Sequence, residues 1–248
     1  MVVVISYLKE LYKYRELLWV LTTRELKVRY KQTSLGVLWA IIQPLSLMLI
    51  FTMVFSYFTK INSEGLPYPI FSYTALLPWT FFQTAVQFGS MSVVNNSGLV
   101  TKVWFPREIL PLSSLLAALV DFLIAGLLLI GLMIFYGTPV TQNIFWIFLL
   151  IPLQMVITAG INFLLAASVV MFRDLKFVIP LGLQILFYAT PVIYSINVIP
   201  DRFFKLVLAN PLTGLVDSYR KILLQGQSPN FYYLSSSLIT GIILLIVG

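Results

Sequence analysis

The chain has 248 residues, of which 59% are hydrophobic and only 10% are charged, and its formal net charge is +7. Soluble domains of this length carry many more charges, so the composition indicates an all-α polytopic membrane protein. The sequence contains neither His nor Cys, which excludes the usual zinc ligands, thiol nucleophiles and disulfide bonds.

The N-terminal region, residues 6–34, is predicted to form helices on the cytoplasmic face of the membrane. Its apolar side chains recur at helical spacing, with basic residues on the other side, as in helices that lie on anionic head groups. The apolar stripe consists of Tyr7, Leu11, Tyr14, Leu18 and Leu21. Thr22 and Glu25 fit a capping box, which predicts that a second helix begins there and carries Arg24 and Arg29. Two roles fit this region: a positively charged anchor, or a surface that docks a partner protein.

Six charge-poor runs are predicted to cross the membrane, because about 20 apolar residues span a hydrocarbon core of roughly 30 Å. The predicted spans are residues 35–58, 70–94, 109–136, 144–172, 177–196 and 231–248. Eleven of the 16 Lys and Arg residues lie before the first span or in the connections that follow the second and fourth spans. Since positive charge is enriched on cytoplasmic loops, both termini and these two connections are predicted to be cytoplasmic.

Several polar or unusual residues lie inside the predicted spans. Pro44 should kink the first span. The second and fourth spans are rich in small and amide residues, which indicates close helix contacts or a water-lined face. Asp121, in the third span, is the only formal charge in any span. No basic residue is expected at its depth, so we predict a structural hydrogen bond, for example to Ser113 or Thr158, in preference to a proton relay.

The connection 97–107 lies between the second and third spans. Gly98 and Pro106 bound it, and Leu99, Lys102 and Val103 would share one face of a short helix. A short amphipathic helix held between two membrane helices can transmit movement of a soluble partner. An ordinary surface loop is the alternative.

The last outer connection, 198–227, contains two short amphipathic segments joined at Asn210 and Pro211. Asn210 fits a helix N-cap, Pro211 the first helical position, and Gly226 a helix stop. We predict a hairpin that re-enters the membrane in preference to one that lies flat on it. Its apolar stripe consists of Leu212, Leu215, Tyr219, Ile222 and Leu223.

The sequence carries no phosphate-binding loop, no paired carboxylates at membrane depth and no nucleophile motif. A transport subunit is therefore expected, not an enzyme, and no cofactor is expected on this chain. Any ATP hydrolysis would take place on a separate chain that acts through the cytoplasmic surface. A passive channel without an ATPase is the alternative from another functional class.

The order and spacing of several motifs resemble the membrane subunits of type-two ABC exporters, in the polysaccharide and polyol-phosphate branch. The motifs cover residues 24–39, 43–44, 76–79, 102–111, 190–194 and 210–212. Within this branch the sequence is most similar to the O-antigen exporters of lipopolysaccharide assembly. Teichoic acid and capsule exporters share much of the same pattern, and small-lipid or drug exporters belong to the same superfamily.

This resemblance implies a homodimer of six-helix subunits bound to two copies of an ABC ATPase, which would bind ATP and Mg²⁺. The substrate would be an undecaprenyl-pyrophosphate-linked polysaccharide that crosses the bacterial inner membrane, and no nucleic acid partner is implied. Residues 97–107 would form the family's coupling helix, residues 6–34 its interface helix, and residues 198–227 its outer gate.

The resemblance also assigns candidate residues to these roles. The coupling residues would be Leu99, Lys102, Val103, Trp104, Phe105 and Arg107. The interface helix would use Tyr7, Leu11, Tyr14, Leu18, Arg24 and Arg29, and the outer gate would use Pro211, Leu215, Tyr219 and Ile222. The candidate channel aromatics, which would stack on sugar rings, are Tyr57, Trp79, Phe82, Tyr188 and Tyr194.

Overall fold

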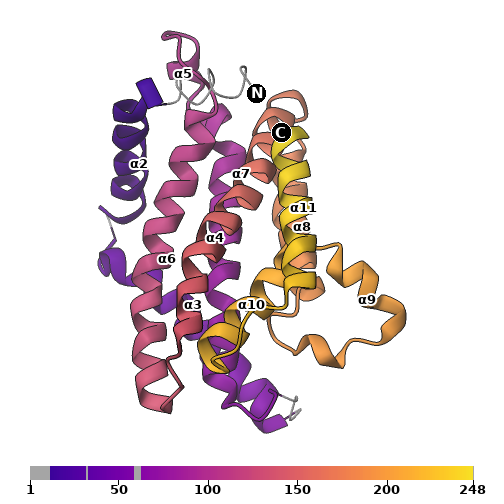
Figure 1. The fold of residues 1–248 in the computed structure, drawn as a ribbon. Helices are drawn as coiled ribbons and strands as arrows, with labels where there is room; N and C mark the ends of the chain where they lie inside the picture. The colour runs from indigo at the N-terminus through magenta and orange to yellow at the C-terminus, as the bar shows by residue number, and fades with distance from the viewer. Residues whose placement is uncertain (1–11, 32, 59–62, 248) are drawn as a thin grey trace.

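The computed structural model describes residues 12–31, 33–58 and 63–247, and every regular element in these ranges is helical. The elements are α2 (Arg15–Tyr30), η1 (Gly36–Leu38), α3 (Trp39–Thr52), the π-helix η2 (Met53–Phe58), α4 (Tyr68–Asn95), α5 (Ser97–Val100), α6 (Ile109–Tyr136), η3 (Gln142–Trp146), α7 (Ile147–Met171), α8 (Leu175–Ala189), η4 (Ile196–Val198), α9 (Asp201–Leu208), α10 (Pro211–Leu224) and α11 (Phe231–Val247). The long helices run side by side as one bundle (Figure 1). The prediction of an all-α fold is confirmed for the described residues.

Helix α4 forms the centre of the bundle and packs against α3, α6, α7, α8 and α10 (Figure 1). Phe71 and Tyr73 are completely buried, and the Tyr73 hydroxyl donates to the carbonyl oxygen of Ala125 on α6 at 3.0 Å. Thr74 donates to the carbonyl oxygen of Ile70 at 2.8 Å. Because neighbouring groups satisfy its polar side chains, a helix with many polar residues can occupy the core of the bundle.

Among the described residues, three helical stretches are long and apolar enough to cross a membrane by themselves: Gly36–Ser56, Ile109–Tyr136 and Gln142–Met171. Helices α8 and α11 are apolar but shorter. The predicted fifth span extends to residue 196, but α8 ends at Ala189. Thr190 has extended backbone because the following Pro191 disfavours helical geometry at the residue before it.

The predicted helix break at Thr22 is wrong, because α2 continues without interruption from Arg15 to Tyr30. The hydroxyl of Thr22 donates to the carbonyl oxygen of Leu18 at 2.8 Å, and Thr23 makes the equivalent bond one residue later at 2.7 Å. The two hydroxyls therefore bond to the preceding turn and do not cap a new helix. The predicted stripe residues Tyr7 and Leu11 lie outside the described residues.

Small residues allow α7 and α11 to approach closely. A Cβ atom on Gly160 of α7 would lie 2.6 Å from the backbone nitrogen of Leu245. On α11, a Cβ atom on Gly241 would lie 2.5 Å from the side chain of Ile157. The helix contact predicted from the small residues of the fourth span is confirmed at this position.

Helices α9 and α10 follow one another toward the end of the bundle opposite α5 (Figure 1), and re-entry of this segment into a membrane stays a prediction. The side chain of Asn210 accepts a hydrogen bond from the backbone nitrogen of Leu212 at 3.0 Å, so it caps α10 as predicted. Gly226 has a φ of 64°, the left-handed conformation in which glycine commonly ends a helix. Helix α10 packs against α4, α7 and α11, whereas α9 projects from the bundle.

Candidate functional site

The connection between α4 and α6 contains only one short helix, α5 (Ser97–Val100). The helix predicted over 97–107 is therefore too long, because α5 ends at Val100; Pro106 further disfavours helical backbone at Phe105. The segment after α5 is exposed: Val103 and Trp104 are 54% and 74% exposed, and Lys102 is exposed beside them. We call Lys102, Val103 and Trp104 the tip; it lies at one end of the bundle (Figure 1).

Phe105 is not part of this exposed surface, because it is only 5% exposed. Its ring packs in a cluster with Leu21 of α2 and with Ile109 and Leu110 of α6. This burial corrects the prediction that Phe105 faces a partner protein. The ring instead anchors the tip to α2 and α6.

Further contacts join the connection that carries the tip to α2 and to Tyr14, the residue before it. The rings of Trp104 and Tyr14 meet edge to face, with 6.3 Å between their centroids. The guanidinium of Arg24 donates to the side-chain oxygen of Asn96, just before α5, at 2.6 Å. Leu99 is half-buried and packs against the same apolar cluster. A displacement of the tip would therefore be passed directly to α2.

Glu25 holds the middle of α2 against α6. Its carboxylate accepts a hydrogen bond from the hydroxyl of Ser114 at 2.7 Å, and its other oxygen is buried without a hydrogen-bond partner among the described residues. Burial raises the pKa of Glu25 above its usual value, although the Ser114 hydrogen bond and the charges of Arg29 and Arg24 act in the opposite direction.

Asp121 of α6 is paired with the end of α2. Arg29 forms an ion pair with one carboxylate oxygen, and the hydroxyl of Tyr30 donates to the other at 2.6 Å. The predicted partners of Asp121 were wrong: Ser113 bonds to Leu110 within its own helix, and Thr158 bonds to Gln154 within its own helix. The prediction missed Arg29 because it placed this residue outside membrane depth.

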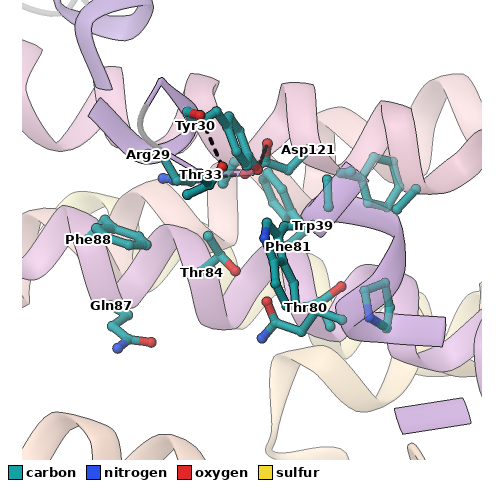
Figure 2. A pocket seen from close by; sticks show the side chains of 16 residues that line it. Arg29, Tyr30, Thr33, Trp39, Thr80, Phe81, Thr84, Gln87, Phe88 and Asp121 are labelled. Atoms are coloured by element: carbon teal, nitrogen blue, oxygen red, sulfur yellow. Dashed lines mark hydrogen bonds and ion pairs between the residues drawn. The ribbon is translucent and has the colours of Figure 1, made fainter. Parts of the chain in front are cut away.

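A cavity of about 460 Å³ opens beside this ion pair, within the size range of ligand sites. Side chains from α2, α3, α4 and α6 line it, and Figure 2 shows Arg29 and Tyr30 directed toward Asp121. Arg29 also lies over the ring of Phe88 on α4, 4.4 Å from its centroid. One cation therefore joins α2, α4 and α6 at the wall of the cavity.

The open face of α4 supplies polar groups to the cavity. Thr80, Thr84 and Gln87 recur at spacings of four and three residues, so they lie along one side of the helix, as Figure 2 shows. Gln43 and Trp39 of the first predicted span complete this part of the lining. Hydroxyl and amide groups both donate and accept hydrogen bonds, so the wall suits an uncharged polyhydroxylated ligand.

The predicted channel aromatics do not form one surface. Trp79 and Phe82 are 2% and 1% exposed in the single chain, and association of two protomers can only bury them further. Their assignment to a channel is therefore wrong for this conformation. Tyr188 is 58% exposed on α8, and the hydroxyl of half-buried Tyr194 donates to its carbonyl oxygen at 3.0 Å. The side chain of Tyr57 lies outside the described residues.

The predicted gate residues of α10 are packed inside the protomer. Leu215, Tyr219 and Ile222 are each at most 2% exposed, and Pro211 begins the helix. The hydroxyl of Tyr219 donates to the side-chain oxygen of Gln154 on α7 at 3.1 Å. In this conformation α10 is thus held firmly against its neighbours.

Arg220 ties α10 to the irregular segment after α8. Its guanidinium is buried and donates to the carbonyl oxygens of Pro191, Val192 and Tyr194 at 2.7, 2.5 and 3.0 Å. A fourth bond reaches the carbonyl oxygen of Phe71 on α4 at 3.3 Å. The first three bonds satisfy carbonyl groups of the non-helical segment that follows α8, which ends at Ala189.

Comparison with known families agrees with this architecture. The family profile described as ABC-2 type transporter matches residues 16–224, which include all of α2 except its first residue, the tip, the cavity and the outer hairpin. The chain belongs to the ABC-2 type transporter family. The match covers most of the described bundle and ends at the last residue of α10.

Individual relatives of this ABC-2 family member are transport proteins. The chain is 34% identical over 244 residues to an O-antigen export system permease protein of Myxococcus xanthus, with 97% of this chain and 93% of the relative covered. It is 32% identical over 234 residues to an O-antigen export system permease protein of Klebsiella pneumoniae, with 94% and 89% covered. It is 24% identical over 208 residues to a polysialic acid transport protein of Escherichia coli, with 82% and 79% covered.

The polar contacts of α2 in this ABC-2 transporter were missed from sequence. Leu18, Thr22, Glu25 and Arg29 recur at spacings of four and three residues, so they form one continuous face of α2. The signal was present in the spacing, but the predicted break at Thr22 divided it. In a continuous helix, Glu25 and Arg29 lie on the same face as Leu18, which packs near α6. Both polar residues would therefore also be expected to contact α6.

Proposed function

We propose that this chain is the permease subunit of an ATP-driven exporter that moves an undecaprenyl-pyrophosphate-linked polysaccharide of the O-antigen type across the bacterial inner membrane. The observation that carries the proposal is the similarity to O-antigen export permeases over nearly the whole of both chains. The active assembly would be a homodimer with two copies of an ABC ATPase, and both termini would be cytoplasmic.

The cavity beside Asp121 supports a carbohydrate route along α4. Thr80, Thr84 and Gln87 present hydroxyl and amide groups at successive levels of the helix. Trp39 and Phe88 add partly exposed aromatic rings at 45% and 44% exposure. A row of uncharged polar groups with aromatic neighbours suits a polysaccharide that moves along α4, because each hydrogen bond to the polymer would be too weak to hold it in place.

The contacts of the tip support a connection from a soluble motor to this cavity. Val103 and Trp104 are exposed, while Phe105 behind them is packed against α2. The other end of α2 is paired with Asp121 at the cavity wall. A push on the tip would reach the cavity through α2. The Arg24–Asn96 hydrogen bond joins this helix to the connection that carries the tip, and the Arg29–Asp121 ion pair joins it to the cavity wall.

A transport assay can test this function. The chain is co-expressed with candidate ABC ATPases, and the complex is reconstituted into vesicles with a radiolabelled undecaprenyl-pyrophosphate-linked polysaccharide. The proposal expects the ATPase to co-purify and the labelled polymer to cross the bilayer only with hydrolysable ATP.

Other outcomes separate the alternatives. Transport of labelled teichoic acid or capsule precursors, but not of the O-antigen type, would assign the chain a different substrate within the polysaccharide and polyol-phosphate branch. ATP-dependent movement of a small lipid or drug alone would indicate another exporter of the superfamily. Nucleotide-independent flux without a co-purified ATPase would indicate a passive channel.

A further inference from the structure

A second groove, of about 490 Å³, lies at the α5 end of the bundle. It is formed where α4 and α7 end and α8 begins, and we call it the basic groove. Arg107, which precedes α6, lines it together with Arg173 and Lys176 from the connection between α7 and α8. Its floor is apolar and is formed mainly by Val93, Val94, Val100, Val169 and Val170.

The three cations of the basic groove have no acidic partner within the described part of the chain. The ion pairs found there join Arg29 to Asp121 and Lys221 to Asp217, away from the groove. The first turn of α8 also contributes partial positive charge at this position. Two carboxylates lie near these three cations: Asp174 at the N-cap of α8, and Glu108 beside Arg107. Since no ion pair among the described residues joins them to the cations, the groove keeps an excess of positive charge that favours an anionic ligand.

The depth of the basic groove matches that of lipid head groups. Val170 lies in the last turn of α7, and Lys176 lies in the first turn of α8. The ends of membrane helices meet the head-group region, where basic side chains contact lipid phosphates. The neighbouring surface of α8 is apolar and exposed, with Phe177 and Leu181 at 70% and 57% exposure.

An apolar crevice of about 320 Å³ adjoins the basic groove between α6 and α7. The two share Val93, Arg107 and Val170 in their linings. Apart from Arg107 and Glu108, the crevice is lined only by apolar side chains, which include Phe163 and Ala167. A soluble anion would leave this crevice empty, whereas a lipid chain would fill it.

We propose that the basic groove and the crevice together form a binding site for an anionic membrane phospholipid. The phosphate lies among Arg107, Arg173 and Lys176, and the first part of one acyl chain lies in the crevice. The site is distinct from the cavity beside Asp121 and does not depend on the proposed polysaccharide substrate. A lipid at this position would brace the α4–α6 connection that carries the tip.

Native mass spectrometry of the purified full chain tests the proposal, with phosphatidylglycerol and phosphatidylcholine of identical acyl chains as probes. Wild-type protein should bind phosphatidylglycerol preferentially. The double variant Arg173→Gln/Lys176→Gln should weaken that binding roughly 30-fold, from a loss of about fivefold for each interfacial cation. The matched control Arg202→Gln/Lys205→Gln, which removes two exposed cations from α9, should bind as wild type does.

A second variant tests the acyl-chain part of the site. Ala167 is exposed in the crevice, so Ala167→Trp can narrow the crevice without entering the core. It should weaken binding of both phospholipids, and all variants should retain the wild-type unfolding temperature. Equal phosphatidylglycerol binding by wild type and Arg173→Gln/Lys176→Gln would overturn the proposal.

Competition distinguishes the source of the phosphate. Inorganic phosphate should not displace phosphatidylglycerol at equal concentration. Displacement by inorganic phosphate, with no effect of Ala167→Trp, would show a site for soluble anions and overturn the proposal. Preferential displacement by undecaprenyl pyrophosphate would assign the site to an export substrate and likewise overturn it.

Discussion

Arg29 of α2 and Asp121 of α6 form an ion pair at the wall of the central cavity, and the hydroxyl of Tyr30 donates to the same carboxylate. This pair fixes the C-terminal end of α2. Near the N-terminal end of the same helix, Tyr14 contacts Trp104 of the tip. Asp121 therefore has a structural partner from α2, and the helix that contacts the connection carrying the tip also forms part of the cavity.

Removal of one partner of this pair should destabilise the protein more than removal of both. Arg29→Met leaves the carboxylate of Asp121 without its cation, and we expect a loss of about 3 kcal/mol in unfolding free energy. Arg29→Met/Asp121→Leu should recover most of this loss, because neither charge remains. Thermal unfolding of the purified variants measures the effect; a double variant less stable than Arg29→Met would contradict it.

The same double variant separates a structural role from a proton relay. If Asp121 acts through its contact with α2, the Arg29→Met/Asp121→Leu protein should still transport when its assembly is normal. A relay requires the carboxyl group itself, so loss of transport by a well-assembled double variant and by Asp121→Asn would support the relay.

The contact between Glu25 and Ser114 should make stability depend on pH. Burial raises the pKa of Glu25, so the folded protein holds this proton at pH values where the unfolded chain has lost it. Its stabilising contribution is complete below the usual pKa of 4.5 and is lost as the pH rises through the folded pKa. Glu25→Gln should therefore gain stability relative to wild type as the pH rises from 4.5 to 7.5. Thermal unfolding across this range tests the effect, with exposed Glu16→Gln as the control; a constant difference would contradict it.

The exposed and buried residues near α5 should behave differently when changed. Val103→Asp or Lys102→Glu should abolish substrate-stimulated ATPase activity of the complex while assembly remains normal, because these side chains are exposed. Phe105→Ala should instead lower the unfolding free energy by about 3 kcal/mol, because it empties a packed cluster. Val140→Asp, at a valine that is 71% exposed near the other end of the bundle, is the matched control. If the Val103→Asp complex retained substrate-stimulated ATPase activity, the tip would be an ordinary surface loop without a role in coupling.

Arg220 should control the order of the segment after α8. Arg220→Met leaves the buried carbonyl oxygens of Pro191 and Val192 without their donor, at a cost of about 1–3 kcal/mol for each unpaired group. Hydrogen exchange should then increase in residues 190–196 and in α10, and Arg220→Lys should give an intermediate increase because it supplies fewer directed donors. Arg202→Met, at an exposed position on α9, should leave exchange unchanged. Unchanged exchange in Arg220→Met would show that these bonds do not order the segment.

Local signals predicted much of this fold, whereas contacts between distant helices were not accessible. The N-cap at Asn210 and the glycine stop at Gly226 depend on neighbouring residues, and both were predicted. The pairing of Asp121 with Arg29 depends on the path of α2 along α6, which a single sequence does not reveal. Trp79 illustrates the opposite error: the resemblance to polysaccharide exporters suggested an aromatic channel wall, but the ring fills the protein core.

ATP-dependent transport by matched complexes tests the central claim most directly. Vesicles are prepared with the partner ATPase and with wild-type, Val103→Asp or Val140→Asp chain, and transport of radiolabelled undecaprenyl-pyrophosphate-linked polysaccharide is measured. The proposed function and the contacts of the tip predict ATP-dependent transport by wild type and Val140→Asp, and none by Val103→Asp. Transport without ATP, or equal transport by all three, would contradict the claim that a motor drives polysaccharide export through this tip.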